Sequence, residues 1–224
     1  MGIKVIITGA TGMIGKGVLY ECLDHHQVDE VLIIGRSALH HEHPKMKQII
    51  HSDFSDYSSI KDQLSGFDAC YLCMGISAAG LSAEKYEEIT HDYTLALASL
   101  LVEQNPAMTC TYVSGEGTDS SEQGRSRWAR VKGKTENDLL KLGFRQAYMF
   151  RPGMIIPLRG IKSRTRMYQF LYDYFMWLVK SIKVVAPNAV VNTTQMGLAM
   201  INATLKGYDK NILRPKDINA LADQ

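Results

Sequence analysis

The sequence predicts a doubly wound α/β domain built on a parallel β-sheet. Two observations lead to this prediction. Short apolar runs alternate with longer helical patterns along most of the chain, and a glycine-rich turn follows the first apolar run. Apolar strands separated by helices imply parallel strands joined by right-handed crossovers, with helices on both faces of the sheet. The 224 residues suffice for one domain with a substantial core, so we expect a single domain over residues 1–224.

Each element is expected from its local pattern. The strands are short apolar runs of the kind found in buried parallel sheets, at residues 3–7, 31–34, 48–51, 69–73, 109–113 and 147–150. The helices are longer stretches with helical periodicity, at residues 14–25, 58–64, 83–103, 127–142 and 194–205. After Pro152 a basic loop precedes an aromatic-rich helical stretch, 167–182. We expect residues 157–189 to form a small lid or substrate-binding region rather than a second domain.

Composition and cysteine usage exclude several classes of protein. A hydrophobic fraction of 46% with 21% charged residues is that of a folded globular chain, and a net charge of +2 does not imply nucleic-acid or membrane partners. No stretch is apolar and long enough to span a bilayer, and the N-terminus lacks a signal-type pattern. Cys70 and Cys73 fall on one expected strand and point to opposite faces, so we expect reduced, buried thiols and a cytoplasmic location.

No metal site is expected. The segment Leu39–Pro44 clusters His40, His41, Glu42 and His43, but no further Cys or His spacing completes a tetrahedral ligand set, and a solvated loop is the favoured interpretation. The basic residues from Arg159 to Arg166 suit either a mobile lid or a surface for a membrane or an acidic partner, and the lid is favoured.

The first apolar run ends in TGATGMIGKG, where Gly9, Gly12 and Gly15 form a G-x-x-G-x-x-G pattern that opens a helix. Glycine allows the tight turn and lets backbone amides approach a pyrophosphate, which then lies at the positive end of the helix. After the first strand of an alternating α/β chain, this pattern predicts dinucleotide binding. The alternative is a glycine-rich turn without a ligand.

The end of the second strand indicates which dinucleotide is bound. Arg36 and Ser37 stand where an NAD-selective protein usually offers an acidic side chain to the ribose, which favours NADP(H) over NAD(H). The alternative for Arg36 is a solvated side chain at a strand end. After the third strand, Asp53 and Phe54 are placed to meet the edge and face of an adenine, although Asp53 suits an ordinary turn almost equally well.

These motifs together resemble the atypical short-chain dehydrogenase/reductases, and most closely the branch of small oxidoreductases like the Tat-interacting protein, with NmrA-like and epimerase-like relatives. The resemblance rests on TGATGMIG, IIGRS, YLCMGIS, HDYTLALAS, YVSGEGTD and FRPGMI, and covers nearly the whole chain. It implies an NAD(P)-binding Rossmann fold. It also implies that the dinucleotide is contacted by Gly9, Thr11, Gly12, Met13, Ile14, Gly15, Arg36, Met74, Gly75, Lys132, Arg151, Pro152, Gly153 and Met154.

The resemblance also raises a question about catalysis. The family places a tyrosine and a lysine four residues apart on the helix after the fifth strand. In this chain Lys132 takes the lysine position and Trp128 the tyrosine position, and an indole N–H cannot act as an acid near neutral pH. Ser114 lies near the level of the family's serine. Glu116 is either a substitute acid or base, or an exposed loop carboxylate.

Two functions therefore follow from the sequence. The first is an NADP(H)-dependent oxidoreductase that acts on a small carbonyl or alcohol, with an incomplete Tyr-x-x-x-Lys site. The second is a non-catalytic NADP(H)-binding redox sensor or interaction module, which would not need the missing acid. Lys132 and Trp128 each have a plainer interpretation as well, a solvated helix lysine and a side chain that packs under the lid. A protein partner or a homodimer remains open.

Overall fold

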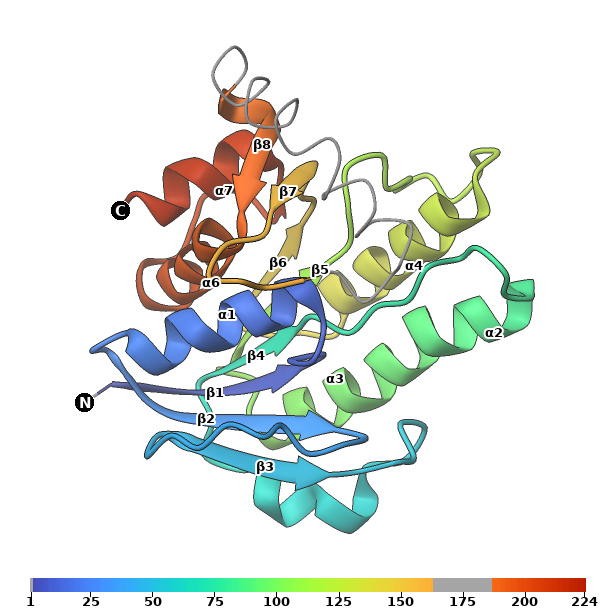
Figure 1. Ribbon diagram of the computed structural model, residues 1–224. Coiled ribbons are helices and arrows are strands. Elements are labelled where there is room, and N and C mark those ends of the chain that lie inside the picture. Colours follow the sequence, from blue (N-terminus) through green and yellow to red (C-terminus); the bar gives the residue numbers. More distant parts are fainter. Residues whose placement is uncertain (1, 163–186) are drawn as a thin grey trace.

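The computed structural model describes residues 2–162 and 187–224. Within these ranges it contains a seven-stranded parallel sheet in the order β3-β2-β1-β4-β5-β6-β9 and a separate parallel pair, β7-β8 (Figure 1). The doubly wound fold class predicted from the sequence is confirmed. The strands of the large sheet are β1 (Ile3–Thr8), β2 (Val28–Gly35), β3 (Met46–Ile50), β4 (Ala69–Leu72), β5 (Thr109–Val113), β6 (Gln146–Phe150) and β9 (Ile212–Leu213).

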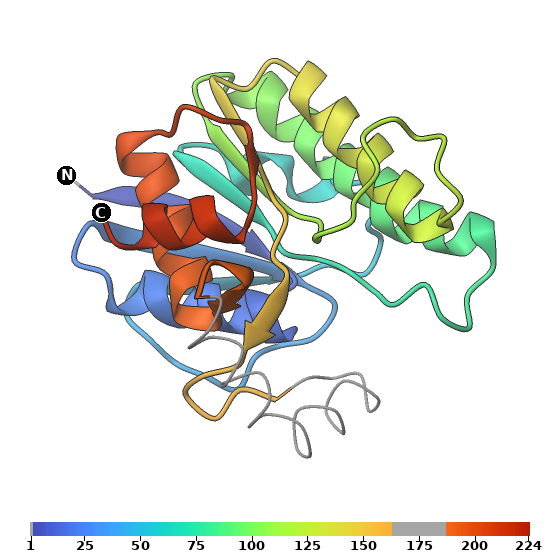
Figure 2. The same ribbon diagram turned by 90° about the horizontal axis from the view of Figure 1, so that it is seen from above.

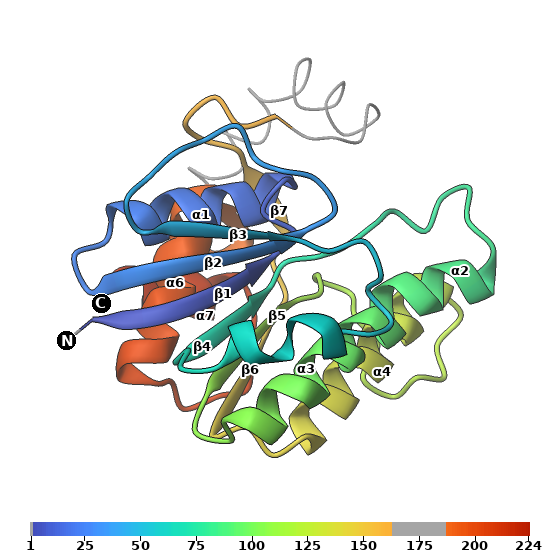
Figure 3. The same cartoon turned by 90° about the horizontal axis from the view of Figure 1, so that it is seen from below.

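Helices cover both faces of the sheet, as Figures 2 and 3 show. One face carries α1 (Met13–Asp24), α6 (Thr193–Lys206) and α7 (Pro215–Ala222), whose apolar side chains form a core with alternate residues of β1 and β2. The other face carries α3 (Tyr93–Gln104), α4 (Arg127–Lys141) and the 3-10 helix η1 (Ser58–Leu64). Strands buried from both sides explain why their sequences are continuously apolar rather than alternating.

Successive residues of a strand face opposite sides of the sheet, and the two cysteines of the CxxC pattern show this. Cys70 belongs to the core on the α3 and α4 side, whereas Cys73 packs against the core on the α1 and α6 side. Cys22, Cys70, Cys73 and Cys110 are all free thiols. Burial raises the pKa of Cys73 to about 12. Three of these thiols are buried and Cys73 is partly buried, so they form part of the core rather than a disulfide pair.

The expected elements differ from the observed ones mainly in detail. The single helix expected at 83–103 is three consecutive segments, α2 (Ala83–Glu87), the π-helix η2 (Glu88–Asp92) and α3. A π-helical segment adds a residue to the turn, and periodicity alone does not reveal it. The short elements β7 (Met154–Ile156), η3 (Pro187–Ala189), β8 (Val190–Asn192), β9 and α7 were not predicted. They are too brief for a periodic pattern, apart from α7, whose start is marked by Pro215.

The close approach of the first strand to the fourth requires glycine at position 9. Gly9 has φ +71°, and a Cβ there would lie 2.5 Å from the carbonyl oxygen of Cys73. A Cβ at Gly15 would collide in turn with the carbonyl oxygen of Gly9. Backbone atoms therefore leave no space for a side chain at either position. Glycine at both allows the start of α1 to pack closely against the ends of β1 and β4.

Most of the predicted lid, residues 157–189, lies outside the described residues, as does all of the aromatic stretch 167–182. The part that is described comprises residues 157–162 and 187–189. The guanidinium of Arg159 pairs with Asp24 at 2.8 Å and lies over the ring of Tyr20, both on α1. At least this residue of the basic segment is thus anchored to the domain.

Candidate functional site

The carboxyl ends of five strands lie side by side in the order β2, β1, β4, β5, β6 (Figure 1). From β1 the chain adds β2 and β3 on one side, and it later returns to add β4 on the other side of β1. The order in which strands are added therefore reverses between β1 and β4, while all strands stay parallel. In open α/β sheets, such a switch point creates a crevice at the carboxyl ends where ligands bind. From β2 to β5 are three strand spacings, or about 14 Å at ~4.8 Å each, which is room for an extended ligand.

The glycine loop occupies the middle of this row. The amide of Gly12 donates to the carbonyl of Gly9 at 2.9 Å, and Gly12 is the N-cap of α1. No side chain caps the helix, and its first turn has no acidic residue. The first-turn amides therefore have no side-chain cap and no opposing negative charge, which is what an anion at a helix N-terminus requires. Met13 and Ile14 begin the helix beside this loop and are half-buried.

The end of β2 presents Arg36 and Ser37 on one side of the glycine loop. Both side chains are exposed. Within residues 2–162 and 187–224, the guanidinium of Arg36 has no ion-pair partner. A positive charge without a carboxylate partner beside a pyrophosphate loop is suited to a further phosphate group.

The residues after β3 have a structural explanation. The Asp53 carboxylate accepts hydrogen bonds from the hydroxyl of Ser55 at 2.6 Å and from its amide at 3.0 Å, and these bonds lower the pKa of Asp53. The ring of Phe54 is buried and stacks on Tyr57. Asp53 thus stabilises a local turn while its side chain stays exposed, and the Phe54 ring packs within the core.

Lys132 lies on the opposite side of the glycine loop from Arg36, where β4 and β5 end. Its side chain is buried, and its Nζ donates to the carbonyl of Val113 at 3.0 Å and lies over the ring of Tyr112. The same Nζ is 3.8 Å from the position that a Cβ of Gly75 would occupy. A lysine here is not the solvated helix lysine that was the alternative. Glycine at position 75 keeps open the space in front of its ammonium group.

The surroundings of Lys132 make its charge costly. Burial lowers its pKa from the ordinary 10.5 to about 8, although the charges of Glu136 and Cys73 act in the opposite direction. Between about pH 8 and pH 10.5 the unfolded chain binds more protons at this lysine than the folded protein does, so stability rises with pH in this window. Below about pH 8 the folded protein carries the full cost, about 3 kcal/mol for two and a half pKa units.

We therefore expect the Lys132→Met variant to gain stability relative to the wild type near neutral pH. This gain should shrink by about 2–3 kcal/mol as the pH rises from about 7 to about 10. The measurement is urea unfolding of both proteins at several pH values. A stability difference that stays constant over this range would show that Lys132 is not buried as an ammonium group.

Trp128 and Lys132 lie four residues apart on α4 and so share one face of the helix. The indole is 38% exposed and lies against the loop after β5, within 3.5 Å of the position of a Gly117 Cβ. Arg127, the residue before it, donates to the carbonyls of Ala78 and Leu81 at 3.2 and 3.0 Å. The first turn of α4 thus contacts both loops, through Trp128 the one after β5 and through Arg127 the one after β4.

The two other candidate catalytic groups both have partners. The hydroxyl of Ser114 donates to Glu136 Oε1 at 2.5 Å and lies 3.2 Å from the carbonyl of Phe150. Glu116 is exposed and accepts from Arg214 Nη1 at 3.1 Å, while its amide donates to the carbonyl of Pro152 at 2.9 Å. This last bond joins the loop after β5 to the loop after β6, where Gly153 and Met154 follow.

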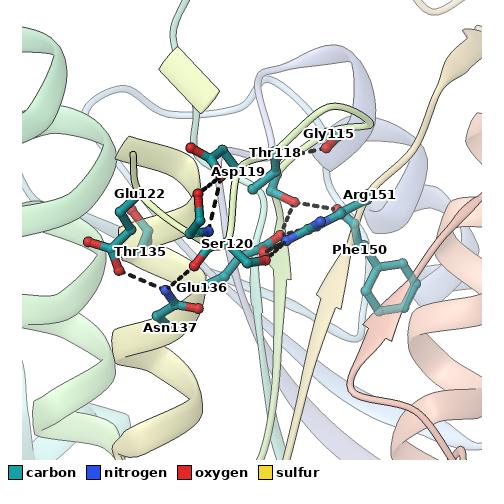
Figure 4. Close-up of polar contacts among 12 residues, drawn as sticks. Gly115, Thr118, Asp119, Ser120, Glu122, Thr135, Glu136, Asn137, Phe150 and Arg151 are labelled. Carbon is teal, nitrogen blue, oxygen red and sulfur yellow. Dashed lines mark hydrogen bonds and ion pairs between the residues drawn. The ribbon is translucent and has the colours of Figure 1, made fainter. Parts of the chain in front are cut away.

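Sequence reasoning missed the buried carboxylate of Glu136, which pairs with Arg151 beneath the site. Arg151 Nε donates to both carboxylate oxygens of Glu136, at 3.0 and 3.1 Å, and its Nη2 donates to Glu136 and to Ser120 Oγ (Figure 4). The Glu136 side chain is fully buried and that of Arg151 is 7% exposed. The guanidinium of Arg151 is therefore directed into the protein, which leaves its backbone atoms for any contact with a ligand. Glu136 follows Lys132 by one helical turn, a spacing that could have singled it out.

The described residues hold no cluster of three or more His, Cys, Asp or Glu side chains that could bind a metal ion. Nor does any described helix combine the length and apolar character that crossing a bilayer requires.

Comparison with known proteins identifies the family. The NAD dependent epimerase/dehydratase family matches residues 5–127, more than half of the 224 residues. Protein HTATIP2 of Rattus norvegicus is 27% identical over 155 residues, which are 68% of this chain and 63%, just under two thirds, of the rat protein. The mitochondrial protein fmp52 of Emericella nidulans is 23% identical over 216 residues, 93% of this chain and 90% of that protein.

A solved structure supports the fold. The Bordetella bronchiseptica enzyme WbmF, in complex with NAD⁺, superimposes with a TM-score of 0.69 at 12% identity, over 99% of this chain and 78% of that enzyme. The cytoplasmic location expected from the sequence, by contrast, is wrong. Several fungal relatives are named as mitochondrial proteins, and reduced, buried thiols do not distinguish between these compartments. By its matched family and its motifs, the chain belongs to the NAD-dependent epimerase/dehydratase family, as an atypical short-chain dehydrogenase/reductase with an NAD(P)-binding Rossmann fold.

Proposed function

We propose that this protein is an NADP(H)-dependent oxidoreductase that acts on a carbonyl or alcohol at the carboxyl ends of β4 and β5. The observation that carries the proposal is the position of the Lys132 ammonium. It is buried, held by the Val113 carbonyl at the end of β5, and faces the space beside Gly75, which follows β4, the strand next to that of the glycine loop. Only one of its three N–H donors has a described partner, so the others remain for ribose and substrate oxygens.

The remaining assignments follow the row of strand ends. The glycine loop and the start of α1 would hold the pyrophosphate, with Arg36 and Ser37 on the adenosine side and Asp53 and Phe54 beside the adenine. Met74 and Gly75 would lie beside the ribose, and the backbone of residues 151–154 beside the nicotinamide. When bound, the nicotinamide supplies or accepts a hydride. The chain's own residues orient both partners and stabilise charge on the oxygen.

A spectrophotometric assay tests this function. NADPH oxidation is followed with a panel of ketones, aldehydes and quinones, in the wild type and in the Lys132→Met and Lys134→Met variants. Lys134 also lies on α4, but its ammonium donates to a carboxylate oxygen of Glu87 at a distance of 2.5 Å. This pair lies away from the strand ends. We expect turnover of at least one class of acceptor, a loss of about 100-fold or more in Lys132→Met, and little change in Lys134→Met. Failure of every acceptor with bound NADPH would contradict the proposal.

The preference for NADP(H) depends on Arg36. A charge-assisted hydrogen bond is worth about 1.5–3 kcal/mol, or about ten- to a hundred-fold in affinity. Arg36→Ala should weaken NADPH binding by that factor and leave NADH binding almost unchanged, because NADH lacks the 2′-phosphate. Nicotinamide fluorescence on titration measures both affinities. Equal losses for the two nucleotides would show that Arg36 does not recognise the extra phosphate.

A non-catalytic role is favoured by a different observation. The Ser114 hydroxyl donates to Glu136, Glu116 pairs with Arg214, and Trp128 has no acidic proton, so the usual proton donors are absent or already engaged. A redox sensor that reports the state of NADP(H) to a partner needs none of them. Such a protein would bind NADPH and NADP⁺ with different affinities but oxidise no NADPH in the acceptor panel.

A further inference from the structure

The proton donors at the site restrict the acceptor. Hydride transfer to a simple ketone produces an alkoxide, an anion about as basic as hydroxide, for which the parent water has a pKa of about 15.7. The transition state of such a reaction needs a nearby acid, and Ser114, Glu116 and Trp128 do not supply one. The Lys132 ammonium could serve as that acid only by giving up its proton, and with it the positive charge that stabilises the oxyanion. What the site does supply is the buried ammonium of Lys132, which can stabilise an oxyanion by charge and hydrogen bonding.

An acceptor whose reduction forms a weakly basic anion would suit a site with a buried ammonium group and no further acid. The two-electron reduction of a quinone yields a hydroquinone monoanion, which is a phenolate, and phenols have a pKa of about 10. Hydride transfer to a quinone therefore needs a positive charge beside the oxygen more than it needs an acid. The pKa of Lys132, about 8, keeps most of this side chain charged near neutral pH.

The polarity of the surrounding surface agrees with an apolar molecule. Large apolar side chains are exposed after β4, in the first turn of α4 and at the start of β7, namely Ile76 at 44%, Trp128 at 38% and Met154 at 37%. Loop contacts draw these three segments together, because Arg127 holds the loop after β4 and the Glu116 amide holds the loop after β6. An exposed indole one helical turn from Lys132 offers an aromatic face for stacking.

We propose that the substrate of this site is a quinone-type carbonyl, stacked on the Trp128 indole with its oxygen at the Lys132 ammonium. The inference rests on the proposed function and narrows its substrate class. In the step, a C–H bond of dihydronicotinamide breaks and its hydrogen leaves with both electrons for the quinone. The quinone is reduced to the hydroquinone monoanion as the nucleotide is oxidised to NADP⁺. A proton from water then completes the hydroquinone.

Binding without turnover gives the first test. Lawsone, a planar naphthoquinone that is an anion at neutral pH, is titrated calorimetrically into the protein saturated with NADP⁺. Lys132→Met should weaken its binding about ten- to a hundred-fold, and Lys134→Met should not. Trp128→Ala should weaken it about three- to ten-fold, whereas Trp128→Phe, which keeps an aromatic face, should change it less than three-fold. Lawsone binding that is insensitive to Lys132→Met would overturn the assignment.

Turnover gives the second test and separates this inference from the broader function. Menadione should be reduced by NADPH at least about 100-fold faster than cyclohexanone, after subtraction of the reaction without protein. Equal reduction of the two acceptors, or reduction of cyclohexanone alone, would overturn the quinone assignment and leave the oxidoreductase function standing. Binding of NADPH without reduction of either acceptor or of any other carbonyl would overturn both.

Discussion

Replacing Trp128 by tyrosine is expected to raise the rate of ketone reduction by about 10²–10⁴, the range that general acid catalysis supplies. The phenol would stand one helical turn from Lys132, whose positive charge favours the phenolate and so makes the proton easier to give up. The indole is already 38% exposed, so its replacement opens no enclosed cavity, and we expect the stability to change by less than about 1 kcal/mol. Steady-state rates with cyclohexanone measure the gain.

Trp128→Phe is the control for this result, because it makes the same reduction in size without adding a hydroxyl. It should leave the ketone rate as low as in the wild type. With menadione, Trp128→Tyr should change the rate only a few-fold, because a phenolate product needs little help from an acid. If the tyrosine and phenylalanine variants reduce cyclohexanone equally well, position 128 is not the place where an acid is missing.

Breaking the Glu136–Arg151 pair is expected to cost about 3–5 kcal/mol of unfolding free energy. Both side chains are buried, and the Glu136→Gln variant would leave the guanidinium charged in the core without its counter-charge. The same carboxylate accepts from the Ser114 hydroxyl, so in the variant Ser114 and Arg151 would compete for the one acceptor oxygen that glutamine keeps. The measurement is urea unfolding of the variant beside the wild type at neutral pH.

A matched control for this variant lies on the same helix. Lys141 on α4 pairs with Asp138 at 3.1 Å, but its side chain is 72% exposed, so Lys141→Met should cost at most about 1 kcal/mol. Replacing Glu136 and Arg151 together by leucine and methionine should recover most of the loss, because no buried charge then lacks a partner. A cost for Glu136→Gln no larger than that for Lys141→Met would contradict the role given to this pair.

The fold could be predicted from the sequence because its strands are buried on both faces. Continuous apolar runs such as Ala69–Leu72 of β4 and residues 147–150 of β6 mark strands of a parallel sheet, and the glycine loop marks where the first strand ends. Short elements could not be found in this way. β9 has two residues and the π-helical turn at Glu88–Asp92 interrupts an otherwise regular helical pattern, so neither leaves a periodic signal.

The candidate site was only partly accessible from sequence. Gly9, Arg36 and Lys132 could be placed because each is tied to the end of one strand or to one turn of a helix. The partners of Ser114 and Arg151 could not, because both reach Glu136 from other elements, and such pairing depends on how the strand ends and α4 come together. The burial of the Phe54 ring could not be predicted either, since it depends on the neighbouring ring of Tyr57.

The central claim is that the carboxyl edge of the sheet, from Arg36 to Lys132, binds a nicotinamide dinucleotide that carries a 2′-phosphate. Calorimetric titration of the purified protein with NADPH, NADP⁺, NADH and NAD⁺ tests it most directly. We expect one molecule of NADPH to bind per chain. NADPH should bind about ten- to a hundred-fold more tightly than NADH, and NADP⁺ should exceed NAD⁺ by the same factor. Absence of binding by all four nucleotides would contradict it, and the glycine loop would then be only a turn of the fold.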